Sequence, residues 1–311
     1  MRGEIFLENQ KLQAKKTFKS IGYALFTMIV LVMVSQVILI AVLNQLVPGI
    51  EKSPWYIGIL VGVPFYLVGT PIFLWMMRKL PDGPKGEAKK LSIKQIVIAF
   101  FISMAASYIF NLVGIIINLL IGMIKGSDIL NPLETIGEGT GIIPTIIFIG
   151  ILSPIIEEVV FRGVLLDKLR GHGERRAIFF TALSFALFHG NLSQFFYAFA
   201  LGLIFAYITL RTNTIRYAVL LHILVNIFGS VIMPNLALSG NEILMILGGL
   251  IVIAFIVVGS LLFSSHFKKI KLEDKKDEFD KRLSKRFAYG NPGMILYYIM
   301  CSLLFIITII S

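Results

Sequence analysis

Three charged side chains lie within two turns of one apolar stretch. The segment 155–163, IIEEVVFRG, places Glu157, Glu158 and Arg162 inside the apolar run 141–166. That run is long enough to cross a bilayer. Each such charge near the middle of a membrane-spanning helix costs roughly 2.5 to 3.5 kcal/mol on insertion scales. The cost argues against an accidental trio, so the sequence predicts a functional site in this helix.

Two more polar pairs have helical spacing inside apolar runs. The segment FALFH places Phe185 and His189 four residues apart, and HILVN places His222 and Asn226 four apart. Residues at this spacing share one face of a helix. Counted along their helices at about 1.5 Å per residue, the polar residues lie roughly 10 to 18 Å from the basic ends. We expect them to meet with Glu157 in one cytoplasm-facing cavity.

The spacing within the first motif assigns different roles to the two glutamates. Glu158 and Arg162 are four residues apart and can pair, whereas Glu157 is rotated by about 100° from Glu158. Glu158 is therefore expected to be a satisfied carboxylate, with Arg162 and Phe185 as structural support. Glu157 is expected to face the cavity as a general base with a pKa tuned by its environment.

Pro154 stands one turn before the carboxylates. It lacks a backbone N–H and is expected to free a carbonyl near Gly150 and to kink the helix. The kink would help to make the cavity wet, but an ordinary tolerated kink explains the proline equally well.

A carboxylate, two imidazoles and a carboxamide suit the hydrolysis of an amide bond. A base must activate water, and donors must stabilise the developing oxyanion. The candidate catalytic residues are Glu157, Glu158, His189, His222 and Asn226. Glu157 and His189 would activate the water, and His222 and Asn226 would donate to the oxyanion.

A second arrangement of the same residues stays open. His189, His222 and Glu157 could hold Zn²⁺ with one position left for water, as in other sites with two histidines and one glutamate. No HExxH segment occurs in the sequence. The cofactor is therefore undecided between zinc and a metal-free glutamate mechanism.

The composition indicates an all-α, polytopic integral membrane protein. The 311 residues are 57% hydrophobic and 15% charged, and the lone cysteine, Cys301, excludes an internal disulfide and a cysteine-rich zinc site. We expect a bundle of about eight or nine transmembrane helices. The apolar runs suggest nine spans, of which the fifth and sixth are short: 21–47, 55–77, 96–124, 141–166, 177–189, 195–210, 215–233, 243–263 and 292–310.

The net charge of +11 is concentrated in the connections on one side of the membrane, which does not indicate a nucleic-acid-binding surface. Alternate connections carry 26 of the 29 Lys and Arg residues, the other connections carry two, and Arg162 lies within a span. Basic connections are cytoplasmic as a rule. We expect the N-terminus inside, the C-terminus outside and contact with anionic lipid, but no nucleic acid.

Two connections and three parts complete the predicted organisation. The segment 125–140 is acidic and rich in turn formers, as expected outside the membrane, and 268–286 is expected to be a solvated cytoplasmic loop or amphipathic surface helix. We divide the chain into a leader with two helices (1–94), a catalytic helical core (95–235) and C-terminal helices with a basic loop (236–311).

These motifs resemble those of the CAAX-processing and bacteriocin-processing (CPBP, or Abi) intramembrane proteases. That family carries EExxxR, FxxxH and HxxxN or HxxxD in this order, which here are Glu157 to Arg162, Phe185 to His189 and His222 to Asn226. The resemblance covers roughly residues 95–235. It implies a helical bundle around a polar cavity and endoproteolysis in or near the membrane, of the metallo or the glutamate type.

The resemblance leaves the biological role open. It is compatible with processing of CAAX proteins or bacteriocins in a prokaryotic cell membrane, and a membrane protein or peptide is the expected substrate. One rival interpretation is a proton- or ion-coupled transporter; another is a non-catalytic bacteriocin-immunity protein. The oligomeric state is open.

Overall fold

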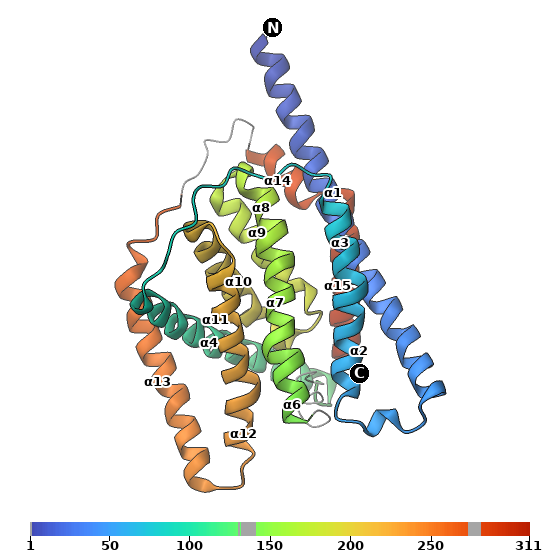
Figure 1. Ribbon diagram of the computed structural model, residues 1–311, viewed down its shortest axis with the longest axis vertical. Coiled ribbons are helices and arrows are strands. Elements are labelled where there is room, and N and C mark those ends of the chain that lie inside the picture. Colours follow the sequence, from blue (N-terminus) through green and yellow to red (C-terminus); the bar gives the residue numbers. More distant parts are fainter. Residues whose placement is uncertain (1, 130, 132–140, 273–280) are drawn as a thin grey trace.

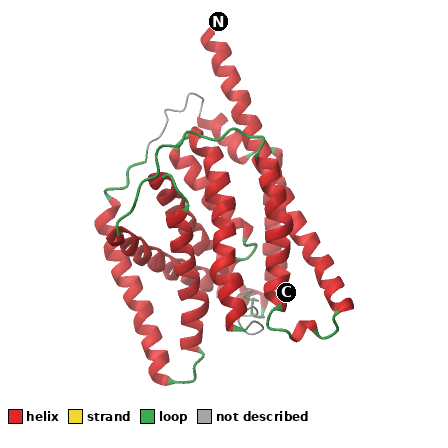
Figure 2. Ribbon diagram, viewed as in Figure 1, coloured by secondary structure: helices red, strands yellow, loops and turns green. Residues whose placement is uncertain are grey.

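The computed structural model describes every residue except 1, 130, 132–140 and 273–280, and all regular structure in the described part is helical (Figure 2). Within the described residues, eight helices are long and apolar enough to cross a membrane, which confirms the expected all-α polytopic bundle. These candidate spans are Lys11–Leu46, Tyr56–Met77, Ile93–Lys125, Ile142–His172, Leu192–Thr212, Arg216–Ala237, Glu242–Phe267 and Pro292–Ile310.

Several spans consist of consecutive helical segments (Figure 1). In chain order the elements are α1 (Arg2–Leu46), η1 (Ile50–Lys52), α2 (Tyr56–Val63), η2 (Pro64–Gly69), α3 (Thr70–Met77), α4 (Ile93–Lys125), α6 (Ile142–Pro144), η3 (Thr145–Leu152), α7 (Ser153–Glu158), η4 (Val159–Leu165), α8 (Leu166–Leu169), η5 (Arg170–His172), α9 (Glu174–Phe188), α10 (Leu192–Thr212), α11 (Arg216–Asn226), η6 (Ile227–Ile232), α12 (Met233–Ala237), α13 (Glu242–Phe267), α14 (Lys281–Tyr289) and α15 (Pro292–Ile310).

The predicted fifth span, 177–189, is a partial crossing. Helix α9 has 15 residues, about 22 Å of helix, whereas a hydrocarbon core is about 30 Å thick. Gly190, with φ of 66°, then reverses the chain, and the Asn191 side chain caps α10 by accepting from Gln194 N. The hairpin of α9 and α10 therefore ends within the bundle, and it places His189 at the turn.

The two ends of the chain lie at opposite ends of the bundle (Figure 1). The described loop 78–92 lies at the N-terminal end, where Lys89 N donates to Thr212 O, at the end of α10. The described basic loop 78–92 and the N-terminus therefore lie at the same end of the bundle, while the predicted orientation in the membrane stays a prediction. Most of the segment 125–140 and the middle of 268–286 lie outside the described residues, and the latter segment overlaps α14.

Four stretches within the spans are wound as π-helix, with wider turns than an α-helix: η2, η3, η4 and η6. In η3 the N–H of Ser153 accordingly donates to the carbonyl of Phe148, five residues earlier. Such turns are rare and frequently occur at functional sites. Here they flank the helix that carries Glu157 and the helix that carries His222.

One hydrophobic cluster joins the three predicted parts of the chain. Phe18 of α1, Phe161 of η4 and Tyr297 of α15 are all buried in it. The Tyr297 hydroxyl also donates to Ser184 O at 2.7 Å, on the helix that ends at His189. The terminal helices thus brace the site-bearing helices, while the three-part division itself stays a prediction.

Helices α1 and α15 cross at two glycines. A Cβ on Gly22 would lie 2.4 Å from Met294 N, and a Cβ on Gly293 would lie 2.5 Å from Tyr23 N. Small residues of this kind allow membrane helices to approach to backbone contact. The two backbones therefore pack closely at this crossing.

A group of five charged residues and one asparagine, which we call the basic-end clamp, ties the loop 78–92 to α8 and α10. Asp167 accepts from Arg170 Nε at 2.6 Å and pairs with Lys85, and Lys168 Nζ donates to Leu80 O at 2.6 Å. The clamp comprises Asp82, Lys85, Asp167, Lys168, Arg170 and Asn213. Its hydrogen bonds fix the loop across the ends of two spans.

Candidate active site

Glu158 and Arg162 form the ion pair that their spacing predicts. Arg162 Nη1 donates to Glu158 Oε1 at 2.8 Å, and both side chains are fully buried. The guanidinium also lies over the rings of Phe185 and Phe205, with its Cζ 4.3 and 5.7 Å from their centroids. Phe185 thus provides the support expected of it, through a cation–π contact. Both groups lie too deep to meet a substrate directly.

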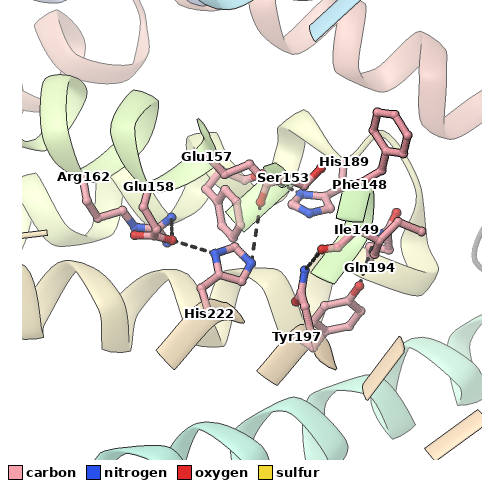
Figure 3. Close-up of polar contacts among 12 residues, drawn as sticks. Phe148, Ile149, Ser153, Glu157, Glu158, Arg162, His189, Gln194, Tyr197 and His222 are labelled. Atoms are coloured by element: carbon pink, nitrogen blue, oxygen red, sulfur yellow. Dashed lines mark hydrogen bonds and ion pairs between the residues drawn. The ribbon is translucent and has the colours of Figure 1, made fainter. Parts of the chain in front are cut away.

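His222 joins the two glutamates. Its Nδ1 lies 2.8 Å from Glu158 Oε1, and its Nε2 lies 3.7 Å from Glu157 Oε2 (Figure 3). An ionised carboxylate only accepts hydrogen bonds, so with Glu158 ionised the Nδ1 atom carries the proton. Glu158 therefore orients the ring and directs Nε2 at Glu157. This contact with the first motif fulfils the expectation that His222 and the glutamates converge.

Glu157 differs from Glu158 in its access to the surrounding space. The Glu157 side chain is 14% exposed, whereas that of Glu158 is 0% exposed. Glu157 lies near Ser153 and His189, on the side of His222 away from Arg162 (Figure 3). Of the two carboxylates, Glu157 is the one that water can reach, as the rotation between them predicts.

His189 approaches the same carboxylate from the turn after α9. Its Nδ1 lies 2.9 Å from the carbonyl oxygen of Phe185, which can only accept, so Nδ1 is the donor. The Nε2 of the neutral ring is then left as a base. The Phe185 ring lies between the two imidazoles and is perpendicular to both. Its centroid is 4.8 Å from that of the His189 ring and 5.9 Å from that of the His222 ring.

Asn226 contacts the carbonyl that Pro154 leaves free. Asn226 Nδ2 donates to Ile149 O at 2.9 Å. In the π-helical register of η3, the missing N–H of Pro154 would have bonded to Ile149, not to Gly150 as expected from α-helical geometry. The freed carbonyl is thus one residue earlier than predicted. One Asn226 N–H is used here, and the carboxamide has a second.

The structure adds four polar residues that the sequence motifs do not reveal. Tyr66 donates to Phe148 O at 3.0 Å and lies 2.9 Å from Ser153 Oγ, while Gln194 Nε2 donates to the Tyr197 hydroxyl at 3.1 Å. Gln194 and Tyr197 lie near Ile149 (Figure 3). Ser153 is signalled only by its position four residues before Glu157. Nothing in the sequence signals Tyr66, because it lies on a separate helix.

The residues suggested as zinc ligands do not form a metal site in this arrangement. Within the described part of the chain, no three His, Cys, Asp or Glu side chains are grouped so that they could hold a metal ion. Because the Nδ1 atoms of His189 and His222 are engaged by Phe185 O and Glu158, only their Nε2 atoms could serve as ligands, and these are not grouped with Glu157 as a metal site requires. The site of Glu157, His189 and His222 therefore does not fit the predicted zinc centre as it stands.

Fold and site together define a class: a polytopic helical membrane protein with a carboxylate and two imidazoles gathered between its spans. Residues 139–228 match the family model described as type II CAAX prenyl endopeptidase Rce1-like. This match confirms the resemblance to the CAAX-processing proteases, and all three motifs lie within the matched segment. The family match supports, for this segment, the reaction class of a CAAX-type endopeptidase. No curated protein and no solved structure matches the chain.

Proposed function

We propose that the protein is an intramembrane endopeptidase that hydrolyses peptide bonds of membrane-associated proteins or peptides. One observation carries this proposal: a water-accessible carboxylate, Glu157, lies 3.7 Å from His222 Nε2, and a buried ion pair holds that imidazole in place. Such a carboxylate and imidazole can share the proton of an attacking water. The Rce1-like match supports the same reaction class and a CAAX-type substrate.

The residues take the following roles in this proposal. Glu157 removes a proton from water as it attacks the scissile carbonyl, with His189 Nε2 as the second base within the site. His222 Nε2, when protonated, and the second N–H of Asn226 donate to the oxyanion that develops. Glu158 and Arg162 are positioning residues, because they act through His222 and do not touch the substrate. Collapse of the tetrahedral intermediate breaks the C–N bond, and the leaving amine takes up the proton.

The basic end of the bundle is proposed to face the cytoplasm. The expected excess of Lys and Arg on one side supports this orientation. A CAAX-type substrate would accordingly enter the site from the cytoplasmic leaflet, where anionic lipid also favours the basic end.

The decisive experiment compares Glu157→Gln with wild type on purified protein in detergent. The substrates are membrane peptides that include prenylated and unprenylated peptides with a CAAX terminus. Loss of the base should lower kcat by about 10² to 10⁴-fold, and unfolding temperatures should stay close. Glu51→Gln, at an exposed carboxylate of η1, is the matched control and should cleave at the wild-type rate.

Two results would overturn the assignment. Wild-type turnover by Glu157→Gln would mean that the base lies elsewhere, and no cleavage of any peptide by wild type would remove the endopeptidase proposal. Cleavage is further expected to survive thorough chelation, because the donor residues do not form a metal site. Loss of cleavage on chelation, with recovery on adding Zn²⁺, would contradict that expectation.

A further inference from the structure

A pocket beside the candidate active site is formed by a helix outside the family-matched segment. It is a small pocket, about 300 Å³ when the space open to solvent is included, and it lies between α2 with η2 on one side and α6 with η3 on the other. Its lining is almost entirely apolar. The lining residues are Ile57, Gly58, Val61, Gly62, Tyr66, Pro144, Phe148, Ile149 and Ser153.

The pocket is continuous with the catalytic helix. Ser153, which lines it, is four residues before Glu157, and Ile149, which also lines it, accepts the hydrogen bond from Asn226. Seen from the basic end, the lining residues of this helix lie deeper than Glu157, by about 6 Å at Ser153 and about 13 Å at Phe148. A substrate that reaches the pocket must therefore extend past the general base, toward the non-basic end of the bundle.

Two glycines of α2 determine the shape of the pocket. A Cβ on Gly58 would lie 2.4 Å from the Phe148 ring, and one on Gly62 would lie 2.9 Å from it. The bare backbone of α2 thus lets the Phe148 ring occupy the space beside it. Pockets for small groups are typically apolar with a few placed polar atoms, and this one fits that description.

The polar end of the pocket offers an acceptor. Tyr66 uses its only proton toward Phe148 O, so in its 2.9 Å contact with Ser153 the serine is the donor. The lone pairs of Ser153 Oγ are then open to a donor from a ligand. A peptide N–H can provide that hydrogen bond, whereas a hydrocarbon tail has no donor.

We propose that this pocket is a substrate subsite for one apolar amino-acid side chain, on the side of the scissile bond away from the basic end. The inference rests on the proposed endopeptidase function. The apolar walls bind the side chain, and Ser153 Oγ accepts from the substrate backbone. The enzyme then selects substrates by the residue beyond the cleaved bond as well as by chemistry at the bond.

Cysteine cross-linking tests the proposal without requiring turnover. Val61 lines the pocket, and Leu67, 70% exposed, is not among the lining residues. Val61→Cys and Leu67→Cys are each made in the Glu157→Gln variant and oxidised with peptides whose single cysteine is moved along the sequence. The native Cys301 is buried, so the chain without an added cysteine is the blank.

We expect Val61→Cys to form a disulfide mainly with peptides that carry their cysteine at one particular position. Leu67→Cys should show no such preference. An even pattern along the peptide, the same pattern for both variants, or no cross-link because lipid fills the pocket would each overturn it.

A kinetic arm separates this subsite from the proposed function. Val61→Phe should lower kcat/KM by about tenfold or more for peptides with a large apolar residue at the cross-linked position, and leave peptides with alanine there unchanged. Leu67→Phe is the control. Equal losses for both peptide sets overturn the subsite while cleavage itself upholds the endopeptidase. A single cross-linked position without any cleavage by wild type upholds the pocket and rejects the endopeptidase.

Discussion

The molecule buries charge in two regions that solve the same problem differently. In the basic-end clamp, charged groups share several partners: Asp167 contacts both Arg170 and Lys85, and Lys168 contacts a carbonyl and Asp82. In the candidate active site, Glu158 Oε2 and two nitrogens of Arg162 have no hydrogen-bonding partner in the described protein. The Arg162 guanidinium is instead covered by aromatic rings.

The two regions differ in how much they depend on any single contact. Shared partners make the clamp tolerant, because the loss of one contact leaves others in place. The candidate active site depends on one ion pair and one imidazole contact, which fix a single ring orientation in a low-dielectric setting. The site therefore fixes the His222 ring with few contacts and has no alternative partners if one is lost. We expect the two regions to respond unequally to mutation.

The largest expected effect is at Arg162. Arg162→Ala leaves Glu158 buried without its cation, so it should destabilise the fold by about 3 to 5 kcal/mol and lower activity with it. Thermal unfolding in detergent, followed by circular dichroism, measures the loss. The exposed Arg78, changed to alanine, is the control and should unfold like wild type.

A charge-neutral double variant sharpens that result. Glu158→Gln combined with Arg162→Met removes both charges and keeps an acceptor for His222 Nδ1. Stability should recover relative to Arg162→Ala, since removing both charges of a buried pair is often neutral. A double variant as unstable as the single one would mean that packing, not the orphaned carboxylate, causes the loss.

An intermediate effect is expected at Arg170 of the clamp. Arg170→Ala removes one donor to Asp167 and the 2.7 Å hydrogen bond to Asn213, but Lys85 stays beside Asp167. We expect a loss of about 1 to 3 kcal/mol, with unchanged kcat for the folded enzyme. Arg216→Ala, at an exposed position three residues after Asn213, provides the baseline. A loss equal to that of Arg162→Ala would remove the contrast between the regions.

The smallest effect is expected at Asp82. The hydrogen bond from Lys168 lowers the pKa of the Asp82 carboxyl below its ordinary value of 3.8. A lowered folded-state pKa stabilises the protein above the ordinary value, and the contribution disappears as the pH falls through the lowered pKa. Because Asp82 is 67% exposed, Asp82→Asn should cost about 0 to 1 kcal/mol at pH 7. Unfolding curves at pH 7 and near pH 3 should show the difference from wild type shrink with acid.

The sequence reveals the site where a local spacing rule applies. Glu158 and Arg162 pair because they are four residues apart on one helix, and His189 and His222 were identified because polar groups are costly within apolar spans. The all-α bundle was likewise predictable from the length of its apolar runs. These features depend only on neighbours along the chain.

Features that depend on which helices are neighbours were not predictable. The contacts of Tyr66 with Phe148 and Ser153 join segments more than eighty residues apart. The π-helical hydrogen bonding before Pro154 leaves the carbonyl of Ile149 free instead of that of Gly150. No sequence pattern around Pro154 predicts this change of register. The sequence predicted on which side of the membrane the charged residues of the clamp lie. It did not predict that they would contact the loop 78–92.

The crossing of Gly22 and Gly293 implies an order of assembly. Helix α1 leaves the ribosome long before α15, and at ordinary rates of synthesis the wait is on the order of tens of seconds. During that interval the glycine face of α1 has lipid, or an insertion factor, in place of its partner. The bundle can close only when its last helix arrives, so translation must be nearly finished before the protein becomes competent.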